Sequence, residues 1–139
     1  MNLVKDYTID KTSWPRGEWD NEGDKYSWNS FGFDCLLIRN QWGAWCGYIG
    51  LPPSHKWHGQ YYDDIEVRVH GGLTYSEDEP PANTDPGAKQ KWWIGFDCSH
   101  AGDITPGLGF RPFPGDTYKD KAYAAINVNL LAMQAKMNV

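Results

Sequence analysis

The sequence predicts an α+β fold, with an antiparallel sheet of about five strands and one long C-terminal amphipathic helix. Short β-prone runs recur between residues 34 and 98, and turns rich in Gly and Pro separate them. Apolar residues then recur at helical spacing near the end of the chain. The 139 residues suit a single domain. Its predicted parts are an irregular Trp-rich segment 1–33, a sheet 34–98, a loop 99–115 and a helix 117–137.

Two β-prone runs in the central part of the chain are predicted to form a hairpin. Residues 35–39 (CLLIR) and 44–49 (AWCGYI) flank a short turn that contains Gly43, which is a typical hairpin pattern. The strongest strand is predicted at residues 91–98 (KWWIGFDC). There Phe96 is expected to face the core and Asp97 the opposite side.

Residues 65–70 (IEVRVH) alternate strictly between apolar and polar side chains. This alternation predicts a half-buried strand whose inward side chains are Ile65, Val67 and Val69. The Gly71–Gly72 pair is expected to form a tight turn, after which residues 73–75 continue as a strand.

The last segment is predicted to be a helix that begins near a capping side chain at Asp116 or Thr117. Its large apolar side chains recur at three- and four-residue steps, which is typical of one face of an amphipathic helix. These side chains are Tyr123, Ile126, Leu130, Met133 and Met137. We expect this face to pack on the sheet, with Ile126 and Leu130 buried.

Charge and cysteine content limit the function classes. The net charge of −5 argues against binding to a nucleic-acid backbone, which needs a face rich in Lys and Arg. It leaves open a protein that occupies another protein's basic groove. No apolar run approaches the roughly 18 residues that span a bilayer, so no membrane partner is expected. The three cysteines form no Cys-x-x-Cys pair, and the first residues of the sequence lack the apolar core of a signal peptide. Both features predict free thiols in a cytoplasm.

Two polar clusters are expected to converge at one end of the sheet. The first is His70 with Gly71 and Gly72, because glycines let a backbone approach a ligand closely and leave amides uncovered. The alternative is a hairpin turn with a locally bonded histidine. The second cluster is Asp97, His100 and Asp103, which follows a predicted buried strand. The strand fixes the position of these side chains, and the loop gives access to them.

The second cluster allows three interpretations. Its side chains, with Cys98, include metal-capable atoms, but no zinc pattern is complete. A carboxylate near His100 can instead orient the imidazole for acid–base work. The third interpretation is a turn capped by its own Asp and Ser side chains. Cys98 as a nucleophile would need a base, which His70 or His100 could supply.

A third candidate is the loop after Pro52 and Pro53, which contains His55 and Trp57. Prolines exclude a central strand here and favour an extended loop. A tryptophan such as Trp57 or Trp92 could stack on a nucleotide base, and the alternative is an ordered surface loop. Residues 76–91 are expected to be a solvated surface loop.

Several motifs together resemble a known group of proteins. They are residues 17–25 (GEWDNEGDK), 47–55 (GYIGLPPSH), 69–75 (VHGGLTY) and 95–103 (GFDCSHAGD). This combination resembles a family of small uncharacterised proteins carried by bacteriophages and bacterial genomes. The resemblance extends from about residue 17 to the final helix. The chain departs from the group in residues 76–91, which are shorter and lack a Cys and a His. The resemblance implies a phage-type accessory protein in the cytoplasm of a bacterial host cell, but no activity.

Three function hypotheses follow from these observations. The first is a protein that binds a small polar ligand, with a nucleotide as one candidate, to counter host defence. Its ligand-binding residues would be His70, Gly71, Gly72, Asp97, His100, Asp103, His55 and Trp57. The second is a small hydrolase that uses His70, Asp97 and His100, with or without a metal. The third is an inhibitor that binds a host protein. The sequence identifies no cofactor and no oligomeric state.

Overall fold

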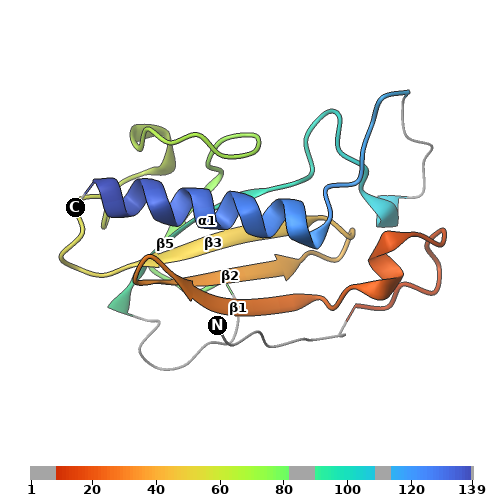
Figure 1. Ribbon diagram of the computed structural model, residues 1–139, viewed down its shortest axis with the longest axis horizontal. Helices are drawn as coiled ribbons and strands as arrows, with labels where there is room; N and C mark the ends of the chain where they lie inside the picture. Colours follow the sequence, from red (N-terminus) through yellow and green to blue (C-terminus); the bar gives the residue numbers. More distant parts are fainter. Residues whose placement is uncertain (1–8, 82–89, 109–113, 139) are drawn as a thin grey trace.

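The computed structural model describes residues 9–81, 90–108 and 114–138. Five strands form one antiparallel sheet in the order β1-β2-β3-β5-β4. The strands are β1 (Lys25–Ser30), β2 (Phe33–Arg39), β3 (Trp45–Leu51), β4 (Tyr75–Glu77) and β5 (Trp92–Asp97). The helix α1 (Lys121–Met137) lies across one face of the sheet (Figure 1). Short 3-10 helices lie at η1 (Glu18–Asn21), η2 (Tyr62–Asp64) and η4 (Pro106–Leu108). The predicted α+β fold is confirmed.

The predicted hairpin is confirmed as β2 and β3, which pair from Asp34 opposite Gly50 to Arg39 opposite Trp45. Asn40 closes the turn, because its side-chain oxygen accepts hydrogen bonds from the backbone nitrogens of Trp42 and Ala44, each at 3.0 Å. An Asx side chain that bonds backbone amides in this way favours a turn over further strand.

The edge strand β1 lies within segment 1–33, which its Trp, Gly and Pro content predicts to be irregular. Tyr26 and Trp28 are buried on the side of β1 that faces the core. The indole nitrogen of Trp28 also donates to Asn129 Oδ1 of α1 at 2.9 Å. Large aromatic side chains two residues apart therefore bring this segment into the sheet.

Residues 66–69 are not part of the sheet, so the strand predicted at 65–70 is wrong. The inward side chains are nevertheless the predicted ones, because Ile65 is buried and Val67 and Val69 pack against the core. The segment is extended and lies beside α1. The strand β4 starts only at Tyr75 and is three residues long.

Amide side chains of α1 take the place of sheet partners for this segment. Gln134 accepts a hydrogen bond from Arg68 N at 2.8 Å and donates one to Arg68 O at 3.0 Å. Asn127 Oδ1 accepts from His70 N at 2.9 Å. Because these bonds satisfy the backbone as a neighbouring strand would, an alternating sequence can be extended here without joining the sheet.

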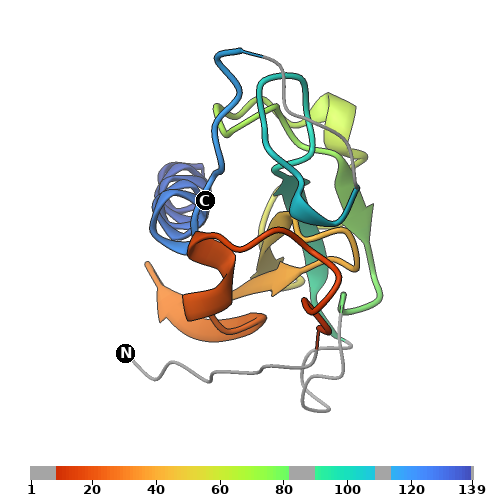
Figure 2. The same cartoon turned by 90° about the vertical axis from the view of Figure 1, so that its right-hand side faces the viewer.

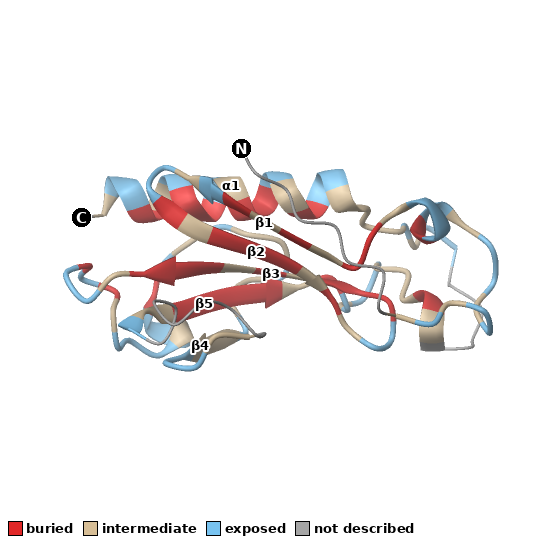
Figure 3. Ribbon diagram, turned by 90° about the horizontal axis from the view of Figure 1, so that it is seen from below, coloured by how far each residue is buried: buried red, intermediate tan, exposed pale blue. Residues whose placement is uncertain are grey.

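The helix buries its small residues and not its large apolar stripe. The buried side chains of α1 are Ala124, Asn127, Val128, Leu131, Ala132 and Ala135. A Cβ on Gly47 of β3 would lie 2.5 Å from Cγ2 of Val128, so the glycine allows the helix to approach the sheet closely. Figure 3 shows α1 buried along the side that faces the sheet and exposed along its outer side.

The prediction that Ile126 and Leu130 are buried is therefore wrong. Ile126 is 58% exposed and Leu130 is 40% exposed, and Tyr123, Met133 and Met137 are exposed with them. The predicted caps are wrong as well. Asp120 caps the helix, with its Oδ1 accepting from Tyr123 N at 2.8 Å. The backbone of Thr117 pairs instead with the loop after β5, through Gly102 O at 2.9 Å and Ile104 N at 2.8 Å.

Candidate functional site

Polar side chains from four separate segments meet at the end of β5. The loop after β5 supplies His100 and Asp103, and it lies against the segment that leads into α1 (Figure 2). Asp97 is the last residue of β5. The extended segment beside α1 supplies His70, and α1 itself supplies Tyr123. We call this group the histidine site; it comprises His70, Gly71, Asp97, His100, Asp103, Lys119 and Tyr123.

Both ring nitrogens of His70 have partners. Nε2 lies 2.7 Å from Asp103 Oδ2, and Nδ1 lies 2.7 Å from the hydroxyl oxygen of Tyr123. The side chain of His70 is 15% exposed and that of Asp103 is 1% exposed. His70 is therefore held rigidly between the loop after β5 and α1.

Asp103 is the most heavily bonded carboxylate of the site. Its Oδ1 lies 2.8 Å from Lys119 Nζ, and its Oδ2 also accepts from His100 N at 3.1 Å. Burial acts to raise the pKa of Asp103, but the hydrogen bonds from Lys119, His70 and His100 N outweigh it and hold the pKa below its ordinary value. Asp103 is therefore ionised at neutral pH.

The ionised carboxylate fixes the proton positions on His70. An ionised Asp103 can only accept, so His70 Nε2 carries the hydrogen and donates it. In the neutral ring, Nδ1 is then an acceptor, and the Tyr123 hydroxyl donates to it. Hydrogen bonds thus link the side chains of Tyr123, His70 and Asp103 in a continuous chain, and the partly exposed phenol of Tyr123 is its outer end.

A second histidine–aspartate pair lies beside the first. His100 Nε2 is 3.2 Å from Asp97 Oδ1, and the rings of His100 and His70 are 6.0 Å apart between centroids. Asp97 is itself positioned by Thr74 Oγ1 at 3.1 Å and by Ser99 N at 3.0 Å. The side chain of His100 is 35% exposed, so it is the more accessible of the two imidazoles.

The donor set of the histidine site suits hydrogen bonding and proton transfer. An imidazole can donate or accept a proton, and an aspartate carboxylate lies within 3.2 Å of each ring. Among residues 9–81, 90–108 and 114–138, no group of three His, Cys, Asp or Glu side chains is arranged to hold a metal ion.

Cys98 takes no part in this chemistry. It is buried, and burial raises the pKa of its thiol far above the ordinary value. Because the thiolate is the reactive form, a cysteine nucleophile at this position is not supported.

His55 and Trp57 do not lie with the other predicted site residues. Both are buried, and His55 Nε2 lies 2.8 Å from the carbonyl oxygen of Ala135, near the C-terminal end of α1. His55 Nδ1 accepts from Trp57 N at 3.0 Å. The pair therefore fastens the loop after β3 to the helix. Trp92 is also engaged, with its indole nitrogen 2.9 Å from Gln60 O.

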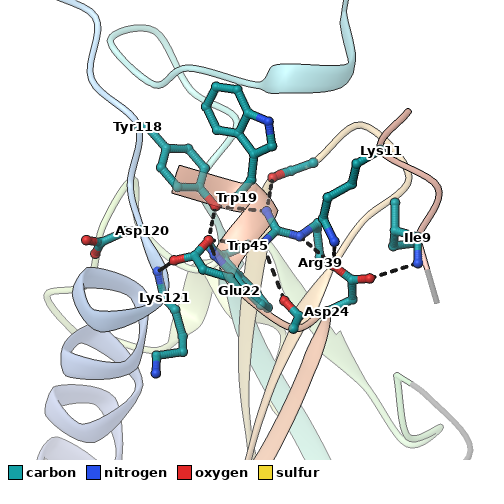
Figure 4. Close-up of polar contacts among 12 residues, drawn as sticks. Ile9, Lys11, Trp19, Glu22, Asp24, Arg39, Trp45, Tyr118, Asp120 and Lys121 are labelled. Carbon is teal, nitrogen blue, oxygen red and sulfur yellow. Dashed lines mark hydrogen bonds and ion pairs between the residues drawn. The ribbon is translucent and has the colours of Figure 1, made fainter. Parts of the chain in front are cut away.

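A buried ionic network surrounds Arg39, which is not among the predicted site residues; Figure 4 shows the network in close-up. Arg39 Nε lies 2.8 Å from Asp24 Oδ1, and Nη2 lies 3.0 Å from Glu22 Oε1. Its guanidinium also stacks 4.3 Å from the ring of Trp45 and donates to the hydroxyl of Tyr118 at 2.8 Å. The signal in the sequence is the period of β2, because position 39 is in phase with buried positions 35 and 37.

This network is structural. Each of the five N–H groups of Arg39 has an acceptor, the remaining two being the carbonyls of Gly23 and Gly43. Glu22 Oε2 accepts from Lys121 N, the first residue of α1, at 2.7 Å. Arg39 and Glu22 therefore join the N-terminal segment, the sheet and the start of the helix, and no donor of Arg39 is left for a ligand.

Comparisons with protein-family models, curated proteins and solved structures gave no match. Within the part of the chain that the structure describes, no helix is long and apolar enough to cross a membrane.

Proposed function

We propose that the chain binds a small polar ligand at the histidine site. The observation that supports this is the pair of imidazole rings, 6.0 Å apart, each with an aspartate oxygen within 3.2 Å of its Nε2. His70 and Lys119 already donate to Asp103 and to loop oxygens, so His100, whose side chain is 35% exposed, is the group that would meet a phosphate or carboxylate group of the ligand.

A nucleotide is the ligand class that we favour. Tyr123 is an exposed aromatic ring at the site, with its centroid 5.3 Å from that of His70, and aromatic rings stack on bases. Trp57 is buried and is no longer a candidate for this contact. The resemblance to phage proteins supports a signal nucleotide of the bacterial host as ligand, and counter-defence as the role.

The test begins with native mass spectrometry of protein purified from a bacterial host, followed by calorimetric titration with inorganic phosphate and with a cyclic dinucleotide. His100→Gln should weaken binding by about tenfold to a hundredfold, which is the effect of losing one hydrogen bond to a charged group. His58→Gln is the matched control, because His58 lies beside Trp92 and away from the site. Equal affinities of wild type and His100→Gln would contradict the proposal.

A second candidate function is acid–base hydrolysis of a phosphate ester. The favouring observation is the chain Tyr123, His70, Asp103, which has the order of a catalytic triad with a phenol as the terminal hydroxyl. His70 would accept the phenol proton as the Tyr123 oxygen attacks phosphorus, and Asp103 would stabilise the resulting imidazolium. The departing alcohol would take that proton from His70, and water would then cleave the bond between phosphorus and Tyr123. With bis(p-nitrophenyl) phosphate as probe, Tyr123→Phe should abolish turnover and retain phosphate binding. A wild-type protein that binds phosphate without turnover would exclude this candidate and leave the binding proposal standing.

A further inference from the structure

The outer face of α1 carries a continuous apolar stripe that nothing in the described part of the chain covers. Its members are Tyr123, Ile126, Leu130, Met133 and Met137. Met137 is 75% exposed and Ile126 is 58% exposed. The stripe is comparable to the largest apolar patch of a typical monomer, and such patches are often binding sites. The stripe is therefore a candidate partner surface.

The spacing of the stripe indicates what kind of surface fits it. Its members follow one another at steps of 3, 4, 3 and 4 residues, which is the a/d pattern of a coiled-coil seam. The face buried on the sheet is a different one, with Val128 and Leu131 at its centre. The helix thus has one face for its own sheet and a second face with the repeat that another helix requires.

We propose that the partner is a second copy of this chain, with the α1 helices packed antiparallel in a symmetric dimer. A two-fold axis near Leu130 places the N-terminal half of the stripe in one copy opposite the C-terminal half of the stripe in the other copy. No Asp or Glu occurs within residues 121–137, so two copies with net charge −5 meet there without facing acids. An antiparallel pair places the negative C-terminal end of each helix dipole beside the positive N-terminal end of the other, whereas a parallel pair aligns like ends.

The size of the stripe is consistent with a specific dimer. From Tyr123 to Met137 it is about 21 Å long at 1.5 Å per residue. At the exposures above it presents on the order of 500 Å² of apolar surface, so the dimer would bury about 1,000 Å² in total. That value is near the lower limit for specific interfaces. We therefore expect a dimer with a dissociation constant in the micromolar range, and not an obligate assembly. The dimer would cover Tyr123, so dimerisation and base stacking on Tyr123 would compete for the same ring.

Sedimentation equilibrium of the purified chain between about 1 and 200 µM tests the dimer. The wild type should shift from monomer to dimer in this range. Leu130→Asp should remain monomeric, with the dissociation constant raised at least about a hundredfold. Tyr61→Asp is the matched control, because Tyr61 is 53% exposed and precedes η2, which lies across the molecule from α1 (Figure 2). A wild type that is monomeric throughout would overturn the proposal, as would a Leu130→Asp variant that dimerises normally.

Disulfide trapping tests the orientation. In the antiparallel arrangement two copies of Leu130→Cys meet near the axis and should crosslink on oxidation. Two copies of Met137→Cys lie roughly 20 Å apart and should not crosslink. A dimer that crosslinks through Met137→Cys and not through Leu130→Cys would contradict the antiparallel proposal. Circular dichroism of each variant establishes that the fold is intact.

Discussion

The imidazole ring of His100 lies directly against the backbone of Gly71, so that a Cβ atom on Gly71 would be 2.4 Å from both Cδ2 and Nε2 of the ring. Gly71 also has a φ of +69°. The glycine therefore serves two purposes at once: it allows the turn, and it leaves room for the ring that Asp97 holds from the other side.

Gly71→Ala should displace His100 and reduce phosphate binding by at least about tenfold. Gly72→Ala is the control, because Gly72 has a similar φ of +78° and nothing within 4 Å of its missing Cβ. Both variants should lose about 1–2 kcal/mol of stability through the left-handed backbone. Urea denaturation and calorimetric titration measure the two effects. If Gly72→Ala weakens binding as much as Gly71→Ala does, contact with His100 is not the reason for the glycine.

Leu131→Ala and Leu130→Ala should differ sharply although the two residues are neighbours. Leu131 is fully buried on the sheet, so its truncation should cost about 2–5 kcal/mol. Leu130 is exposed, and its truncation should cost less than about 0.5 kcal/mol in dilute, monomeric protein. Urea denaturation at low micromolar concentration measures both values. Equal losses would mean that the helix is rotated from the described position.

Arg39→Met should cost about 3–5 kcal/mol, because it removes the buried cation that Asp24 and Glu22 share and leaves Asp24 with Lys11 alone. Lys91→Met is the control. Lys91 pairs with Asp34, but both side chains are partly exposed, so its loss should cost less than about 1 kcal/mol. The comparison uses urea denaturation at pH 7. A small effect of Arg39→Met would show that the network relaxes or admits water.

Asp103 should contribute to acid sensitivity. The pKa of Asp103 is lowered in the folded protein. At pH values between this folded pKa and the unfolded pKa of about 3.9, the unfolded chain therefore binds more protons than the folded chain. The stabilisation from Asp103 is then complete above about pH 5 and is lost as the pH falls through the folded pKa. Asp103→Asn should be less stable at pH 7 and should show a shallower fall in stability from pH 5 to pH 3. Asp78→Asn, at an exposed position, should keep the wild-type slope.

The three cysteines are free, as predicted, and should be unreactive in the folded protein. Burial raises the pKa of Cys35 and Cys46 to about 12 and raises that of Cys98 further. At pH 8 Ellman's reagent should therefore label the native chain slowly and should count three thiols after unfolding without reductant. One thiol in the unfolded chain would indicate a disulfide. Fast labelling of the native chain would indicate that a cysteine is exposed.

The spacing of apolar residues predicted where helices and extended segments occur more accurately than it predicted which side chains and segments they pack against. The spacing of apolar residues correctly placed a helix near 121–137, but two faces of that helix satisfy the same period. Side-chain size suggested that the large residues are buried. Packing favours the small ones, because Ala124, Ala132 and Ala135 let the helix lie close to the sheet. Likewise, alternation at 65–70 identified the inward side chains, but it does not specify whether a strand or amide side chains such as Gln134 satisfy the backbone.

The candidate site was predictable where a motif kept its residues together. His100 and Asp103 follow directly from the end of a strand, and the turn at Gly71 brings His70 to them. Tyr123 and Lys119 were missed, because their contribution depends on where α1 begins. His55 was misplaced, since an extended loop after two prolines has no period that fixes the direction of a side chain.

The helix that covers the sheet is also the last of these elements to be synthesised. When β5 has been made, residues up to Met137 still lie 40 positions ahead, which takes about 2–8 s at roughly 5–20 residues per second. During that interval Leu37, Ile49 and Phe96 have no cover, and residues 66–70 lack the amide partners that hold them. The nascent chain therefore carries an open apolar sheet face while it is still being translated, and that period is when a chaperone or an unwanted neighbour can bind it.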